Sequence, residues 1–170
     1  MSDRNVIQVP IGGIATARNP GVLTTLLGSC VGLVLQDLRN QVAALAHVVR
    51  PNGKGAGMGP GYFADQAAAN ARDLLLQAGA DPRHLLARLA GGGRMVRTGV
   101  DIGARNAAAL KEECYRLGMT FGGHVDGPVD GGCFLVVETA TGKVSVRPLV
   151  AGGADDGAWR QLRQDLEGPK

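Results

Sequence analysis

A cysteine and a histidine stand on two neighbouring apolar segments of this chain. Cys30 comes just before the apolar run 31–36, and His47 lies within the apolar run 43–49. A thiol becomes a strong nucleophile when a nearby base removes its proton, and imidazole is the usual base. Such a pair can attack an amide or ester carbonyl and hold the acyl group as a thioester. Cys30 and His47 are therefore candidates for a catalytic pair.

The two apolar runs are predicted to form a β-hairpin, because the residues between them are of the turn-forming type. A tight turn closed by Asp37 and Asn40 would place Cys30 directly opposite His47. Directly opposed residues of an antiparallel pair project from the same face, with Cβ atoms roughly 4.5–5.5 Å apart. A shift of one residue would place the two side chains on opposite faces. The predicted contact thus depends on the register of this hairpin.

Both residues also have a purely structural interpretation. A cysteine that follows a small residue is commonly a packed, inert side chain, and a single histidine on an apolar strand is commonly a hydrogen-bonded core residue. The wider sequence has to decide between the two interpretations.

The other cysteines and histidines indicate neither a disulfide framework nor a metal site. The chain has three cysteines with no Cys-x-x-Cys spacing. Cys114 shares a predicted helical face with apolar residues and Cys133 begins an apolar run, so both are predicted to lie in the core. His84 and His124 have no acidic or thiol partner at ligand spacing. We expect no metal and no cofactor.

The composition is that of an ordinary soluble domain. The chain has 170 residues, a hydrophobic fraction of 45% and a net charge of +3. It has no basic run or basic stripe with interleaved aromatics, which argues against nucleic-acid binding. No segment resembles a signal peptide or approaches the ~20 apolar residues that a membrane span requires. We expect a cytoplasmic monomer with no membrane insertion.

The predicted elements are mainly strands in hairpins, with two helices inserted, which favours an α+β fold over a parallel α/β sheet. Residues 1–150 are predicted to form one domain, and residues 151–170 a polar C-terminal tail with a short helix around Trp159 and Leu162. The strands and helices are predicted at 6–9, 14–18, 22–27, 31–36, 43–49, 62–77, 105–117, 119–122, 134–138 and 143–149, whereas 84–90 is compatible with either.

A first enzyme interpretation comes from Gly28-Ser29-Cys30-Val31-Gly32. It matches the Gly-x-nucleophile-x-Gly elbow of α/β-hydrolases, with cysteine in place of serine. That elbow requires a helix after the nucleophile, whereas the segment that follows here is strand-like. A small-ester or amide hydrolase of that class is therefore the less favoured alternative.

Several short motifs, taken in order, resemble the chemoreceptor glutamine deamidase family CheD. The resemblance covers roughly residues 5–150. The motifs are Thr25-Leu26-Leu27-Gly28-Ser29-Cys30-Val31, Leu45-Ala46-His47-Val48, Tyr62-Phe63-Ala64-Asp65, Leu89-Ala90-Gly91-Gly92, Ile102-Gly103-Ala104-Arg105-Asn106 and Thr141-Gly142-Lys143-Val144. The resemblance implies a mixed β-sandwich with flanking helices, related to cysteine hydrolases of the glutamine-deamidating toxin type.

The resemblance also implies a Cys-His-Thr catalytic set. By position, the nucleophile is Cys30, the base is His47, and the hydroxyl that orients the imidazole is Thr25. Thr24 is the alternative for the third role, because the chain is one residue shorter than many relatives between this threonine and Gly28. A threonine within an apolar run is otherwise simply a strand former. Backbone N–H groups from Gly28 to Cys30 are candidates for stabilising the oxyanion.

The family implies partners as well. Its members convert selected glutamines on cytoplasmic chemoreceptor helices to glutamates, and some bind a CheC-type phosphatase. Relatives usually carry an arginine in a glycine-rich stretch before the last hairpin, whereas residues 127–132 of this chain contain aspartate and no basic residue. A non-enzymatic adaptor is the alternative function, although a pure adaptor need not retain Cys30 and His47.

Overall fold

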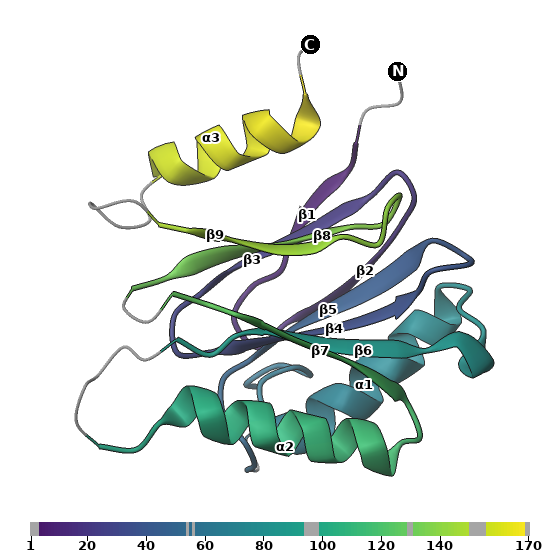
Figure 1. The fold of residues 1–170 in the computed structure, drawn as a ribbon, viewed down its shortest axis with the longest axis vertical. Coiled ribbons are helices and arrows are strands. Elements are labelled where there is room, and N and C mark those ends of the chain that lie inside the picture. The colour runs from purple at the N-terminus through teal and green to yellow at the C-terminus, as the bar shows by residue number, and fades with distance from the viewer. Residues whose placement is uncertain are drawn as a thin grey trace.

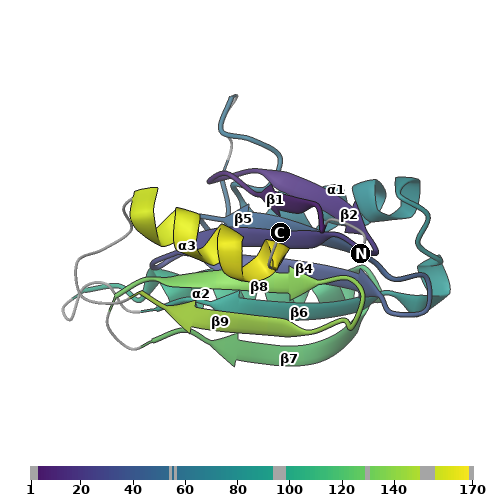
Figure 2. The ribbon, with the colours of Figure 1, turned by 90° about the horizontal axis from the view of Figure 1, so that it is seen from above.

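The computed structural model of the protein has four layers, two β-sheets packed face to face with helices on both outer sides (Figure 1). It describes residues 4–53, 55, 57–93, 99–128, 131–149 and 156–168. The view from above shows the strands of the two sheets stacked over one another beneath α3 (Figure 2). The predicted α+β fold with a mixed β-sandwich is thereby confirmed, and its kinship with deamidating toxins stays a prediction.

Both sheets mix parallel and antiparallel strands. The five-stranded sheet has the order β2-β5-β4-β6-β7, in which only β6 and β7 pair in parallel. The four-stranded sheet has the order β1-β3-β8-β9, in which only β1 and β3 pair in parallel. The bounds are β1 Val6–Gln8, β2 Ile14–Arg18, β3 Val22–Leu27, β4 Val31–Asp37, β5 Val42–Val48, β6 Leu86–Gly91, β7 Thr120–Asp126, β8 Cys133–Glu138 and β9 Val144–Pro148.

Helices α1 (Ala64–Gln77) and α2 (Ile102–Arg116) cover the outer face of the five-stranded sheet, and α3 (Asp156–Glu167) covers that of the four-stranded sheet (Figure 1). A 3₁₀ turn, η1, spans Pro82–His84. The segment that the sequence leaves ambiguous becomes this turn followed by β6.

Strands β4 and β5 are buried along their whole length because both of their faces are covered. On one face, side chains such as Leu33 and Ala46 pack against α1 and α2. On the other, side chains such as Val34 and Leu45 pack against the second sheet. Burial on both faces explains why these strands are continuous apolar runs rather than alternating patterns.

The expected C-terminal helix is present and packs on the domain. Leu162 and Leu166 of α3 are buried in a cluster with Val22 and Phe134, and the Trp159 ring meets the Phe134 ring edge-on at 4.6 Å between centroids. The expected domain boundary after residue 150 lies outside the described residues. The polar side chains of this segment thus lie on one face of a helix whose other face is apolar.

The predicted register of the β4–β5 hairpin is wrong by two residues. Gly32, not Cys30, is the partner of His47. The strands end at the pair Asp37 and Val42, because the Asp37 carboxylate accepts hydrogen bonds from two N–H groups of the turn, those of Arg39 and Asn40, at 3.1 Å each. The loop therefore spans residues 38–41, two residues more than the predicted turn closed by Asp37 and Asn40. A shift of two preserves the face, so Cys30, just before β4, still lies on the side of the sheet from which His47 projects.

Glycines let the start of α2 pack directly on the end of β6. A Cβ atom at Gly103 would overlap the backbone of Gly92, whose carbonyl carbon and Cα would be 2.7 and 2.8 Å away. The Gly92 N–H in turn donates to the Cys30 carbonyl at 3.0 Å. The contact therefore links a helix terminus to the segment that carries the thiol.

We predict that Gly103→Ala destabilises the protein. Alanine is up to about 1 kcal/mol better than glycine within a helix, whereas forcing a methyl group against fixed backbone typically costs about 1–3 kcal/mol. The free energy of unfolding, measured by urea titration, should therefore fall despite the better helix former. A gain in stability would contradict the close contact.

Candidate functional site

A hydrogen bond between the two sheets holds the imidazole of His47. Thr25 on β3 and His47 on β5 both project into the layer between the sheets, and Thr25 Oγ1 lies 2.8 Å from His47 Nδ1. Both side chains are buried. The structure thus brings together the two residues expected to be base and orienting hydroxyl, although β3 and β5 belong to different sheets.

The second hydrogen bond of Thr25 determines how the imidazole is protonated. Thr25 Oγ1 donates to the Val9 carbonyl at 2.7 Å. A hydroxyl has one hydrogen to donate, so toward His47 this oxygen accepts, and Nδ1 carries the proton. In the neutral ring, Nε2 is then the unprotonated nitrogen with a free lone pair. Nε2 is buried and has no hydrogen-bond partner within the described part of the chain.

Thr24 faces the other way. Its hydroxyl donates to the Leu135 carbonyl at 2.8 Å, and its side chain lines a small cavity under α3, beside Trp159 and Leu162. Successive side chains of a strand point to opposite faces. Of the two threonines that the sequence left open, Thr25 is the one bonded to His47.

Cys30 lies on the same face as His47 but is not hydrogen-bonded to it. Its half-buried side chain packs on the cluster between the sheets. Because Gly32 pairs with His47, Cys30 is its diagonal neighbour, a position at which cross-strand residues are roughly 7–8 Å apart. Gly32 has no side chain to separate the thiol from the imidazole. A Cβ atom at Gly32 would also overlap Leu135 Cδ2 of the opposite sheet.

Burial keeps both reactive groups neutral. It lowers the pKa of His47 from 6.5 to about 4, and it raises the pKa of the Cys30 thiol above its ordinary value. At neutral pH the resting site therefore holds a thiol and an unprotonated imidazole, rather than a thiolate–imidazolium pair. In this state His47 can accept a proton.

The sequence motifs around this site identify a family, and comparisons with known proteins agree. The model of the family described as CheD chemotactic sensory transduction matches residues 49–148. This chain belongs to the CheD family. The matched range begins after His47 and so includes none of Thr25, Cys30 and His47.

Curated CheD relatives are similar over most of their length. The chemoreceptor glutamine deamidase CheD of Thermotoga maritima is 40% identical over 113 residues, which is 65% of this chain and 72% of that one. The protein of the same name from Bacillus velezensis is 41% identical over 117 residues, covering 64% and 70% of the two chains. A probable chemoreceptor glutamine deamidase CheD of Symbiobacterium thermophilum is 35% identical, with 84% of this chain and 98% of that one covered.

Among solved structures, the Neisseria meningitidis protein NMB0706 of the DUF152 family aligns with 69% of this chain and 53% of its own. The TM-score is 0.34 and the identity 13%. A similarity of this size carries no argument about fold or function.

The backbone of His47 is held by glycines of the β1–β2 connection. Gly12 N–H donates to the His47 carbonyl, and His47 N–H donates to the Gly13 carbonyl, both at 3.0 Å. Gly12 has a φ of +75°, which favours glycine. The glycine pair was visible in the sequence, but nothing in its spacing pointed to His47.

Asn106 is a further polar residue whose position sequence reasoning did not explain. It is fully buried on α2, and its Nδ2 donates to the Val49 carbonyl, directly after β5, at 2.9 Å. It shares a helical face with Leu110 and Cys114, which are also buried. A polar residue on an otherwise apolar face was the signal that could have revealed this anchor.

The remaining histidines have structural partners. His124 Nε2 lies 2.9 Å from the Gly91 carbonyl, and His84 lies beside the Asp81 carboxylate. Within the described ranges, no group of three or more His, Cys, Asp or Glu residues could hold a metal ion. In the same ranges no helix is both long and apolar enough to cross a membrane.

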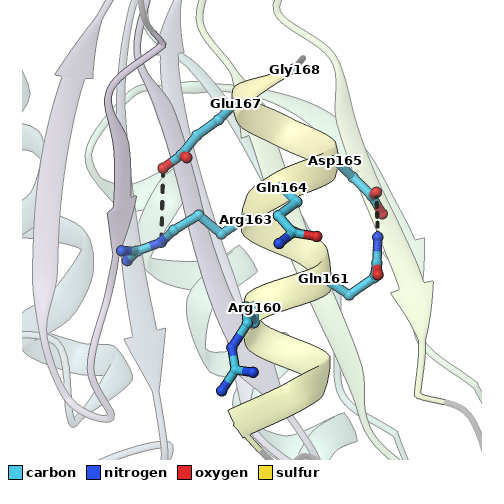
Figure 3. A pocket seen from close by; sticks show the side chains of 7 residues that line it. All are labelled: Arg160, Gln161, Arg163, Gln164, Asp165, Glu167 and Gly168. Atoms are coloured by element: carbon cyan, nitrogen blue, oxygen red, sulfur yellow. Dashed lines mark hydrogen bonds and ion pairs between the residues drawn. The ribbon is translucent and has the colours of Figure 1, made fainter. Parts of the chain in front are cut away.

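A surface hollow lies along the outer face of α3, away from Cys30. Figure 3 shows that its polar side chains pair along the helix. Gln161 donates to Asp165 at 2.9 Å, and Arg163 lies 4.0 Å from Glu167. These are the i, i+4 contacts of a solvated helix face. This hollow therefore does not indicate a binding site.

The buried imidazole predicts a pH-dependent stability. Because the pKa of His47 is about 4 in the folded protein and near 6.5 when unfolded, the unfolded chain binds more protons between these pH values. The free energy of unfolding should therefore fall as pH drops from 6.5 toward 4, with a contribution of up to about 1.4 kcal/mol per pH unit. Urea titrations at several pH values in this range give the free energy of unfolding as a function of pH. This free energy should change less with pH for His47→Asn than for the parent protein. An equal pH dependence in the two proteins would refute the lowered pKa.

Proposed function

We propose that this chain is a chemoreceptor glutamine deamidase in which Cys30 is the nucleophile, His47 the general base and Thr25 the residue that orients His47. The hydrogen bond from His47 Nδ1 to Thr25 carries the proposal, because it leaves Nε2 as the free base on the face where Cys30 lies. The names of the CheD relatives support the substrate and the reaction.

The first half of the reaction converts the glutamine amide to a thioester. His47 Nε2 takes the proton from Cys30 Sγ as the sulfur attacks the carboxamide carbon, which becomes tetrahedral with a negatively charged oxygen. The imidazolium then gives this proton to the amide nitrogen. The C–N bond breaks, ammonia leaves, and the acyl group stays on Sγ.

The second half releases glutamate. His47 is again neutral and takes a proton from a water molecule, whose oxygen attacks the thioester carbon. The C–S bond breaks as the tetrahedral intermediate collapses, and the proton held by His47 returns to the sulfur. The carboxylate product ionises, and the site regains its neutral thiol and imidazole.

Thr25 supports both halves by keeping one orientation of the ring. The chain Nδ1–H to Oγ1–H to the Val9 carbonyl polarises each of its members. This orientation remains suitable when His47 is protonated, because Nδ1–H donates in both states. Thr25 thus has the role that a carboxylate has in many hydrolase triads.

The site belongs, on this proposal, to a cytoplasmic, monomeric enzyme whose macromolecular substrates are chemoreceptors. A CheC-type phosphatase is proposed as a second partner, on the family resemblance. Neither proposal requires a metal or a cofactor, since thiol, imidazole and water supply each atom and proton of the reaction.

The first test is the conversion of a receptor glutamine. The purified protein, incubated with cytoplasmic fragments of chemoreceptors, should produce the amide-to-acid mass change at specific glutamines. Cys30→Ala should abolish this change because no other group supplies the nucleophile, and Cys114→Ala serves as the thiol control. A parent protein that converts no glutamine would support the adaptor alternative, and a fully active Cys30→Ala would refute the mechanism.

The second test compares the two adjacent threonines. Thr25→Val removes the acceptor for Nδ1–H and should lower kcat on the order of tenfold or more, since the imidazole loses its orientation. Thr24→Val removes a hydroxyl of similar burial that bonds on the other face, and it should leave kcat within about twofold. Equal losses in both variants, at equal stability, would contradict the role of Thr25.

A further inference from the structure

Some of the exposed large apolar side chains of the described residues lie on segments next to the end of the five-stranded sheet where Cys30 lies. Five described residues of this kind are exposed: Ile11 70%, Tyr115 60%, Val100 56%, Leu38 48% and Met58 44%. Single exposed apolar residues are normal on a protein surface. The placement of Ile11, Met58 and Val100 relative to the site is what matters.

Ile11 and Met58 are fixed next to the strand that carries His47. Gly12, which follows Ile11, donates to the His47 carbonyl. The carbonyl of Met58 lies directly against the Cα of Gly12, so closely that a Cβ atom there would overlap it. Gly61 N–H also donates to the Gly12 carbonyl at 2.8 Å. Backbone contacts thus hold both residues near the backbone of His47.

Val100 is linked to Cys30 from the β6 side, across β4 from β5. It precedes α2, whose Gly103 packs on Gly92, and Gly92 is bonded to the Cys30 carbonyl. We call Ile11, Met58 and Val100 the site rim. The other two exposed residues lie elsewhere, because Leu38 is in the β4–β5 turn at the far end of the sheet and Tyr115 is in the last turn of α2.

The spacing between the segments that carry Ile11 and Cys30 matches the width of a helix. Strands β2 and β4 pair with the two edges of β5 and both begin where β5 ends. Neighbouring strands are roughly 4.8 Å apart, so the start of β2, next to Ile11, and the start of β4, next to Cys30, are roughly 10 Å apart. An α-helix with side chains is about 10–12 Å wide. A helix whose axis lies between these two strand starts, about 5 Å from each, therefore contacts Ile11 on one flank and directs side chains of its other flank at Cys30.

We propose that the site rim is the docking surface for the chemoreceptor helix that carries the target glutamine. This inference rests on the proposed function. Because the thiol is half-buried, only the glutamine side chain reaches it, and the main chain of the substrate lies on the rim. The rim then packs against apolar side chains that neighbour the glutamine on the receptor helix. It selects glutamines with apolar neighbours over glutamines surrounded by charge.

The test measures binding separately from chemistry. The Cys30→Ala protein is titrated with a cytoplasmic chemoreceptor fragment, and Ile11→Asn or Met58→Gln is added in the same background. Each rim substitution should raise Kd about fivefold or more, as expected for an apolar contact at an interface. Leu38→Asn is the matched control, since Leu38 and Met58 are similarly exposed, and it should leave Kd unchanged.

Kinetics of the intact protein provide the second measurement. With Cys30 present, the rim substitutions should raise KM while kcat changes by less than about twofold, because they act before the chemical step. An unchanged Kd and KM, an equal effect of Leu38→Asn, or no binding at all would overturn the proposal.

The two proposals fail in different ways. If the parent converts no glutamine but binding still depends on Met58, the deamidase function is refuted and the docking surface stands. If conversion occurs with a KM that is insensitive to Ile11 and Met58, the docking surface is refuted and the function stands.

Discussion

The hydrogen bond between Thr25 and His47 makes the site a property of the whole sandwich. The two side chains come from different sheets, 2.8 Å apart at their bonded atoms. Such a distance is met only if the sheets stack at a fixed spacing and in a fixed lateral position. The core residues between the sheets, Leu45 and Leu135 among them, therefore contribute to the geometry of the imidazole.

Much of this arrangement follows from the sequence, because strands buried on both faces are long apolar runs and helices are closed by glycines. Gly79 and Gly118 end α1 and α2 with positive φ values, as their positions in the sequence indicate. The register of the β4–β5 hairpin, by contrast, does not follow from the sequence. It depends on the hydrogen bonds that one carboxylate, that of Asp37, makes with its turn, and residue types alone do not show which of several turns will close.

The candidate site was predictable in a similar, partial way. The family motifs single out Cys30 and His47. Strand alternation places Thr24 and Thr25 on opposite faces of β3, but the sequence does not show which of these faces meets His47. Choosing Thr25 over Thr24 required the position of the second sheet. Contacts between residues distant in sequence, such as that of Asn106 with Val49, are likewise absent from any local pattern.

The bond from Thr25 to the carbonyl of Val9 makes the site depend on the start of the chain. Val9 directly follows β1, the first strand of the chain, and its own N–H donates to the Thr24 carbonyl at 2.8 Å. The acceptor that fixes the Thr25 hydroxyl, and through it the His47 ring, thus comes from the segment next to the N-terminal strand β1, which lies beside β3. The geometry of the candidate site thereby depends on a backbone group from the start of the chain as well as on the stacking of the two sheets.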